Sequence, residues 1–108
     1  MTSKRVYIAA PYTHGDPVVN TQDVLSMAET LLEKGYTPLI PHLCHLWHLC
    51  SPHPYAYWIE VSERWLAMAD CVLRLPGESK GASHEEVLAA KWGIPVYHSL
   101  SALQLGEK

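Results

Sequence analysis

The segment that decides the fold begins with an apolar run, Val72-Leu73-Arg74-Leu75, continues through Pro76-Gly77-Glu78-Ser79-Lys80-Gly81, and enters a helical stretch that carries Glu85-Glu86. A short apolar run, a turn with glycine and a helix start are typical of one unit of a parallel α/β sheet. A helix start also favours a bound anion, because its first N–H groups have no partner within the helix. The segment therefore predicts a strand, an anion-binding turn and a carboxylate one helical turn away.

The composition of the chain narrows the class of protein. Its 108 residues are enough for one domain with a hydrophobic core, so we expect residues 1–108 to form a single domain. A formal net charge of −3 without a basic block argues against a nucleic-acid partner, and a small polar or anionic ligand fits better. We see neither a signal peptide nor a membrane-length apolar stretch, which predicts a cytoplasmic protein without a membrane partner. Three cysteines without a CxxC spacing indicate free thiols.

Strand and helix patterns alternate along the chain. Apolar runs predict strands at 5–10, 37–40, 71–75 and 94–98. Helices are predicted between them: one that Asp16-Pro17 begins and Gly35 ends, one at 55–69, one that follows Gly81 and runs to Trp92, and a short one that Ser99 caps. The fold class is therefore α/β, a flavodoxin-like or Rossmann-like parallel sheet of four or five strands in the order 2-1-3-4, with helices on both faces.

The helix patterns also predict which faces pack on the sheet. In the first helix we expect a buried stripe, made of Val24, Leu25, Ala28, Leu31 and Leu32. In the second we expect one face to carry Trp58, Val61, Trp65 and Met68. The segment 42–54, rich in proline and histidine, is predicted as an irregular connection. Because ligands of such sheets bind at the carboxyl ends of the strands, the loops at 11–16, 42–53 and 76–81 should form the site.

Three motifs in this order resemble a known family. They are Val6-Tyr7-Ile8-Ala9-Ala10-Pro11, Asp70 before the third strand, and Ser79-Lys-Gly81-Ala-Ser-His-Glu85-Glu-Val-Leu-Ala89. Together they resemble the nucleoside 2-deoxyribosyltransferase superfamily, which includes the 2'-deoxynucleoside 5'-phosphate N-hydrolases, from residue 5 to about residue 97. The resemblance implies cleavage of the N-glycosidic bond of a nucleoside or its 5'-monophosphate, by hydrolysis or by transfer to another base, without a cofactor. It also implies a homodimer or a dimer-based oligomer.

The resemblance places the chemistry on two residues. The family's nucleophile falls on Glu85, and the tyrosine that hydrogen-bonds it falls on Tyr7, at the end of the first strand. A local argument agrees, because Ser83-His-Glu-Glu86 reads as a capping box that occupies Glu86 and leaves Glu85 free. We expect the helix dipole to favour the ionised form of Glu85.

The remaining substrate contacts are predicted around these two. Ser79, with the N–H groups of Gly81 and Ala82, matches the position at which monophosphate hydrolases of the family tend to have serine, and Pro11 follows the first strand. Ser62 stands where the family commonly has an Asp that contacts the base. Glu60 and Glu63 flank it on other faces of the helix, so His42, His45 or His48 would have to protonate the leaving base. With that Asp missing, a catalytically silent nucleotide-binding module of the same fold is the alternative function.

The histidines at 42, 45 and 48 also invite a metal hypothesis. Cys44, Cys50 and His53 lie nearby, and these residue types bind zinc. The spacing is not one of the strong zinc patterns, however, and Leu43, Leu46, Leu49 and Trp47 alternate with the histidines. We therefore expect no metal and predict that His42 and Trp47 form an aromatic wall over the base.

Overall fold

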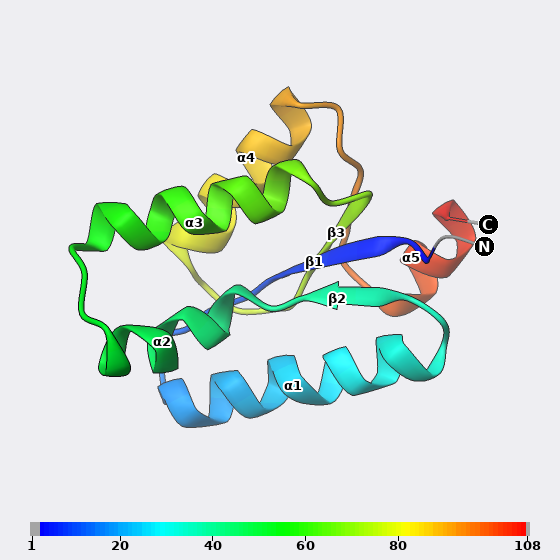
Figure 1. The fold of residues 1–108 in the computed structure, drawn as a ribbon. Helices are drawn as coiled ribbons and strands as arrows, with labels where there is room; N and C mark the ends of the chain where they lie inside the picture. Colours follow the sequence, from blue (N-terminus) through cyan, green and yellow to red (C-terminus); the bar gives the residue numbers. More distant parts are fainter. Residues whose placement is uncertain (1–2, 108) are drawn as a thin grey trace.

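A computed structural model describes residues 3–107, which fold into three layers (Figure 1). The middle layer is a parallel sheet of four strands, in the order β2-β1-β3-β4. Its strands are β1 (Arg5–Ala9), β2 (Thr37–Leu39), β3 (Cys71–Arg74) and β4 (Val96–Tyr97). The predicted fold class and strand order are confirmed, and each strand is slightly shorter than predicted.

Helices cover both faces of the sheet. Residues of α1 (Pro17–Glu33) and α5 (Leu100–Gly106) pack on one face. Residues of α3 (Tyr55–Ala67) and α4 (Lys80–Lys91) pack on the other, which is the upper layer in Figure 1. A short 3-10 helix, η1 (Pro41–Leu43), and α2 (Cys44–Cys50) follow β2 at the carboxyl edge of the sheet.

Both central strands are buried on both faces. In β1, Val6 and Ile8 point to the layer of α1, whereas Tyr7 and Ala9 point to the layer of α3 and α4. All four are fully buried. This alternation follows from the period of two in a strand, and it directs the Tyr7 side chain toward α4.

The helix ends follow the predicted signals more closely than the helix faces do. Asp16 caps α1 by accepting hydrogen bonds from the N–H groups of Val18 and Val19, and Gly35 follows its end with a φ of +88°. The buried stripe of α1 is narrower than predicted: Val24, Ala28 and Leu31 are buried. Leu25 and Leu32 are exposed to 38% and 59%.

One prediction for the middle of the chain is wrong. The segment 42–54 is not irregular, because η1 and α2 occupy most of it. In α3 the fully buried residue is Leu66, and Met68, at the C-cap, is half exposed. The first turns of α3 extend beyond the ends of the strands (Figure 1), and Tyr55, Trp58 and Ile59 of these turns line a cavity. Among residues 3–107, no helix combines the length and apolarity that a membrane crossing requires.

Candidate active site

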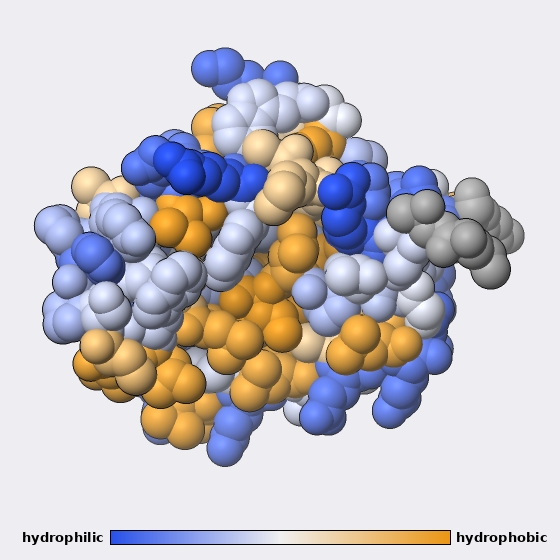
Figure 2. Space-filling view, viewed as in Figure 1, coloured by the Kyte–Doolittle hydropathy of each residue, from blue (hydrophilic) through white to orange (hydrophobic). Residues whose placement is uncertain are grey.

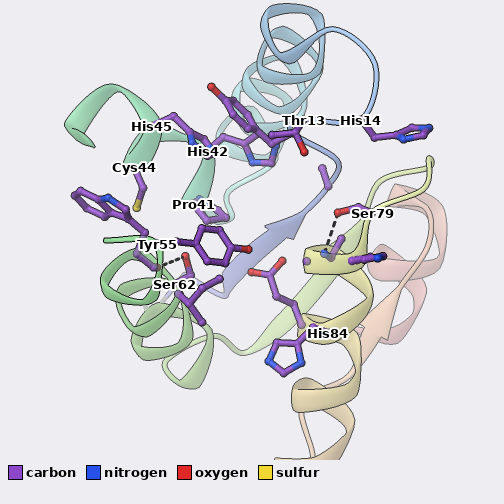
Figure 3. A pocket seen from close by; sticks show the side chains of 18 of the residues that line it. Thr13, His14, Pro41, His42, Cys44, His45, Tyr55, Ser62, Ser79 and His84 are labelled. Atoms are coloured by element: carbon purple, nitrogen blue, oxygen red, sulfur yellow. Dashed lines mark hydrogen bonds between the residues drawn. The ribbon is translucent and has the colours of Figure 1, made fainter. Parts of the chain in front are cut away.

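A cavity of about 850 Å³ lies at the carboxyl edge of the sheet. It is bounded by the loop after β1, by η1 and α2, by α3, and by the start of α4 (Figure 3). Its lining includes Ala10, Tyr12, Thr13, His14, Pro41, His42, Cys44, His45, Tyr55, Trp58, Ile59, Ser62, Glu63, Glu78, Ser79, Lys80, Gly81, Ala82, His84 and Glu85. Of the predicted site residues, it thus brings together Glu85, Ser79, Gly81, Ala82, His42 and Ser62.

Glu85 lies on the face of α4 that packs on the sheet. Ala82 and Ala89 are buried on this face, three residues before it and four after it, and their small side chains let the helix come close to the strands. The hydroxyl of Tyr7 donates a hydrogen bond to Oε2 of Glu85. The contact predicted from the sequence is therefore present, although Tyr7 stands in the middle of β1 and not at its end.

Burial dominates the electrostatics of this pair. It raises the pKa of Glu85 to about 7, against the lowering effects of the Tyr7 hydrogen bond and the Arg74 charge, while the charge of Glu63 raises it further. Burial and the neighbouring Glu85 raise the pKa of Tyr7 far above its usual value, so the phenol remains a donor. Desolvation therefore outweighs, at this depth, the preference of a helix start for an ionised Glu85.

The start of α4 differs from the predicted capping box. Ser79 is the N-cap, and its Oγ accepts a hydrogen bond of 3.0 Å from the N–H of Ala82. Ser83 lies within the helix, and Glu86 is engaged by Arg74 and His98 instead of the first turn. Because Ser79 Oγ is the acceptor in the cap, its own hydroxyl hydrogen is free to donate into the cavity. Lys80 lines the same end, so this end of the cavity has the features of an anion site.

The opposite wall of the cavity is aromatic. His42 is buried, its Nε2 donates a hydrogen bond of 2.8 Å to the carbonyl oxygen of Pro11, and burial lowers its pKa. His45 stacks on Tyr12 with 6° between the ring planes, and burial lowers its pKa to about 4. Pro11 thus holds the His42 ring in place through its carbonyl oxygen. At neutral pH both histidines are uncharged, which suits contact with a flat base.

Trp47 does not occupy the predicted place. It is 46% exposed and packs edge-on against Trp58, and it is Trp58 that lines the cavity. Nδ1 of His48 accepts hydrogen bonds from Nε1 of Trp58, at 2.7 Å, and from the N–H of His53, at 3.2 Å. His48 therefore fixes the Trp58 ring and is not itself part of the cavity lining.

The α3 wall contains a carboxylate that the sequence analysis placed elsewhere. Ser62 lies in the cavity as predicted, and its Oγ donates a hydrogen bond of 2.9 Å to the carbonyl oxygen of Trp58. Glu63 lines the cavity too, whereas Glu60 pairs with Arg64 at the surface. The signal was available in the helical spacing of Tyr55, Trp58, Ile59, Ser62 and Glu63, which share one face.

Metal-ligand types do not converge in the described part of the chain. Within residues 3–107, no group of three or more His, Cys, Asp or Glu side chains is arranged to hold a metal ion. His42, His45 and His48 instead make the separate contacts given above.

A family model matches residues 4–99 and is described as Domain of unknown function (DUF7768). The chain belongs to the DUF7768 family. Among curated proteins, none matches this DUF7768 chain. Six chains of solved structures match it, one of them from work on the 2-deoxyribosyltransferase of the psychrotolerant bacterium Bacillus psychrosaccharolyticus. That likeness has a TM-score of 0.64 at 17% sequence identity, and it covers 85% of this chain and 69% of the other. At this identity it shows the fold: the DUF7768 chain has the fold of a 2-deoxyribosyltransferase.

Proposed function

We propose that this protein cleaves the N-glycosidic bond of a deoxynucleoside or its 5'-monophosphate. The observation that carries the proposal is the buried Tyr7–Glu85 pair at the floor of an open cavity. A carboxylate with a pKa near 7 is ionised in a large fraction of molecules at neutral pH, and the Tyr7 hydroxyl holds one of its oxygens in place. The other oxygen is then available to attack a sugar carbon. The structural likeness to a 2-deoxyribosyltransferase supports this chemistry.

The reaction takes two steps, as in retaining glycosidases. In the first, an oxygen of Glu85 bonds to C1' of the sugar while the bond from C1' to the base nitrogen breaks and its electron pair leaves with the base. In the second, water or the nitrogen of another base attacks C1' and releases Glu85. Hydrolysis yields a free base and the sugar or its 5-phosphate; transfer yields a new nucleoside or nucleotide.

Glu63 is the group that supports protonation of the leaving base. It lines the same cavity as Glu85, and its charge adds a small part to the rise in the pKa of Glu85 that burial causes. The neutral state of His42 and His45 makes these histidines poor acids at neutral pH, which removes two of the three donors considered from the sequence. A protonated Glu63 would give its proton to the base in the first step, and the carboxylate that this leaves would take a proton from the attacking water in the second.

The start of α4 supports a 5'-phosphate on the substrate. Ser79 can donate its hydroxyl hydrogen to a phosphate oxygen while its Oγ still caps the helix. Lys80 adds a positive charge, and the N–H groups of the first turn, including that of Gly81, point toward the helix start. With the base between Trp58 and the Tyr12–His45 stack, the phosphate would lie at the other end of the cavity.

A silent nucleotide-binding module is the second candidate. It is favoured by Ser62, which stands where the nucleoside 2-deoxyribosyltransferase superfamily commonly has an Asp that contacts the base. Here Ser62 donates a hydrogen bond to a backbone carbonyl oxygen. Such a module would bind a monophosphate through Ser79 and the aromatic wall without breaking a bond.

We further propose that two copies of the chain form a homodimer. Four side chains at the end of η1 and on α2 are 45% to 77% exposed: Leu43, Leu46, Trp47 and Leu49. Figure 2 shows hydrophobic residues continuing from this region over β2 and α1. Since α2 also borders the cavity, a second copy on this face would cover apolar surface and narrow the open side of the site. A cytoplasmic location and a single domain over residues 1–108 remain predictions.

The decisive experiment is an incubation with matched deoxynucleosides and their 5'-monophosphates, followed by chromatography for free base. We expect base release from the wild type and a loss of at least about 1000-fold in Glu85→Gln. Glu60→Gln, at an exposed carboxylate outside the cavity, is the control and should keep full activity. Binding of monophosphate without any base release by the wild type would favour the silent module.

A further inference from the structure

Arg74 is a charged residue at the end of a buried strand. It is 8% exposed, and its guanidinium makes three contacts. Nη1 donates to the carbonyl oxygen of Leu75, Nη2 donates to that of Gly77 at 2.7 Å, and Nε donates to Oε2 of Glu86 at 3.3 Å. On its other oxygen, Glu86 contacts Nε2 of His98 at 2.8 Å. The guanidinium therefore links the turn after β3 to the second turn of α4.

The same turn is held from the opposite side by the loop after β1. Gly77 has a φ of +117°, and a Cβ built there would lie 2.8 Å from Cγ of Pro11. Only glycine fits this contact without a shift of either backbone or ring. The turn is thus clamped between Pro11 and the fork of Arg74, two residues before Ser79.

Stability alone does not account for a buried arginine here. Removing a guanidinium from water is costly, and apolar residues of similar volume often serve a core equally well. What an apolar residue cannot do is hold two backbone carbonyl oxygens at fixed positions, since this takes several donors in a rigid fork. The contacts of Arg74 therefore indicate a geometric role.

We propose that Arg74 is a positioning residue that fixes the turn at 75–79 and thereby sets where Ser79 meets the 5'-phosphate of the substrate. The inference rests on the proposed function for the phosphate, but the clamp itself is a property of the free protein. Arg74 is not among the residues that line the cavity of Glu85, and its donors contact carbonyl oxygens of the turn, so it acts through Ser79 and not on the substrate.

Hydrogen exchange of the free protein tests the clamp independently of any activity. In Arg74→Met we expect the amides of Ala82 and Ser83, which donate hydrogen bonds to Ser79, to exchange at least about tenfold faster, while the amides of β1 and α1 keep their rates. Arg74→Lys retains the charge without the fork and should also loosen the turn. Arg64→Met, at an exposed arginine of α3, is the matched control and should leave the turn unchanged. Unaltered exchange of the Ala82 and Ser83 amides in both Arg74 variants would overturn the proposal.

Steady-state kinetics then test the consequence for the substrate. In Arg74→Lys, which is the milder change should Arg74→Met fail to fold, we expect KM for the monophosphate to rise about tenfold and KM for the nucleoside to change little. The two KM values rising together would contradict the role in phosphate positioning even if exchange shows a loosened turn. If the wild type releases no base, the proposed function fails. The affinity for the same monophosphate, measured by calorimetric titration, then replaces KM. Equal affinity in the wild type and Arg74→Lys would overturn the inference.

Discussion

Glu85 is a carboxylate on the core-facing side of a helix, and its burial makes the stability of the protein depend on pH. Its folded pKa of about 7 lies above its ordinary value of 4.5, so between these values the folded state binds more protons than the unfolded state. The free energy of unfolding therefore falls as the pH rises from about 5 to above 7. Below this range Glu85 is protonated in both states, so its burial does not lower the free energy of unfolding in this way.

From this we predict that Glu85→Gln stabilises the protein at high pH. At pH 8 the free energy of unfolding should exceed that of the wild type by about 1 to 3 kcal/mol, and at pH 5 the two should be nearly equal. Urea unfolding at both pH values measures the difference. Glu86→Gln is the comparison, because Glu86 pairs with the buried Arg74: it should lose stability at pH 8, and equal gains in both variants would contradict the prediction.

The hydroxyl of Tyr7 should affect both the rate and its pH dependence. Its hydrogen bond lowers the pKa of Glu85, so Tyr7→Phe should move the rise of kcat/KM with pH to a midpoint above 7, and reduce turnover roughly 10- to 1000-fold. The other groups acting on Glu85, Glu63 on α3 and Arg74 on β3, are unchanged by this substitution. A pH–rate profile measures the effect; Tyr57→Phe, outside the cavity lining, should match the wild type.

At the scale of elements, the start of α4 combines a cap and an anion site in one serine. Aspartate also caps helices well, so Ser79→Asp should leave the fold and the cap in place while putting a negative charge against the phosphate. We expect a monophosphate to bind the wild type at least about tenfold more tightly than its nucleoside, and Ser79→Asp to reverse this order. Calorimetric titration of the matched pair gives both constants. Equal binding of the two ligands by the wild type would remove the phosphate from the proposal.

The sequence predicts elements well where a local signal marks their ends. Asp16, Gly35 and Ser99 each stand at the predicted cap or stop, because capping depends only on a few neighbouring residues. Helix α2 was missed for a physical reason: most of its apolar residues are exposed, so it lacks the buried stripe by which a short helix is recognised.

The candidate site likewise has features that local motifs predict and features that depend on packing. Tyr7, Glu85 and Ser79 could be found from motifs, since the sheet topology brings the carboxyl ends of β1 and β3 together. The raised pKa of Glu85 could not be predicted from a motif, because it depends on how deeply α4 packs on the strands. Nor could the sequence show that Trp58, and not Trp47, lines the cavity, because this depends on how the two rings pack edge-on against each other.

For the whole molecule, the exposed apolar side chains of α2 predict a homodimer. Analytical ultracentrifugation should give a mass twice the 12.1 kDa of the chain. Leu46→Glu, at a side chain 63% exposed on α2, should produce monomers without unfolding the chain. Leu105→Glu, at a side chain 70% exposed on α5, is the control and should remain dimeric. A wild type that sediments as a monomer at all concentrations would contradict the dimer.

The contact between Tyr7 and Glu85 joins residues 78 positions apart in the chain. A pairing of such sequence separation forms late, because the intervening segment must first be ordered and its loop entropy overcome. During translation Tyr7 emerges early, and its partner follows only when nearly the whole sheet has been made. A nascent or half-unfolded chain therefore has no oriented carboxylate.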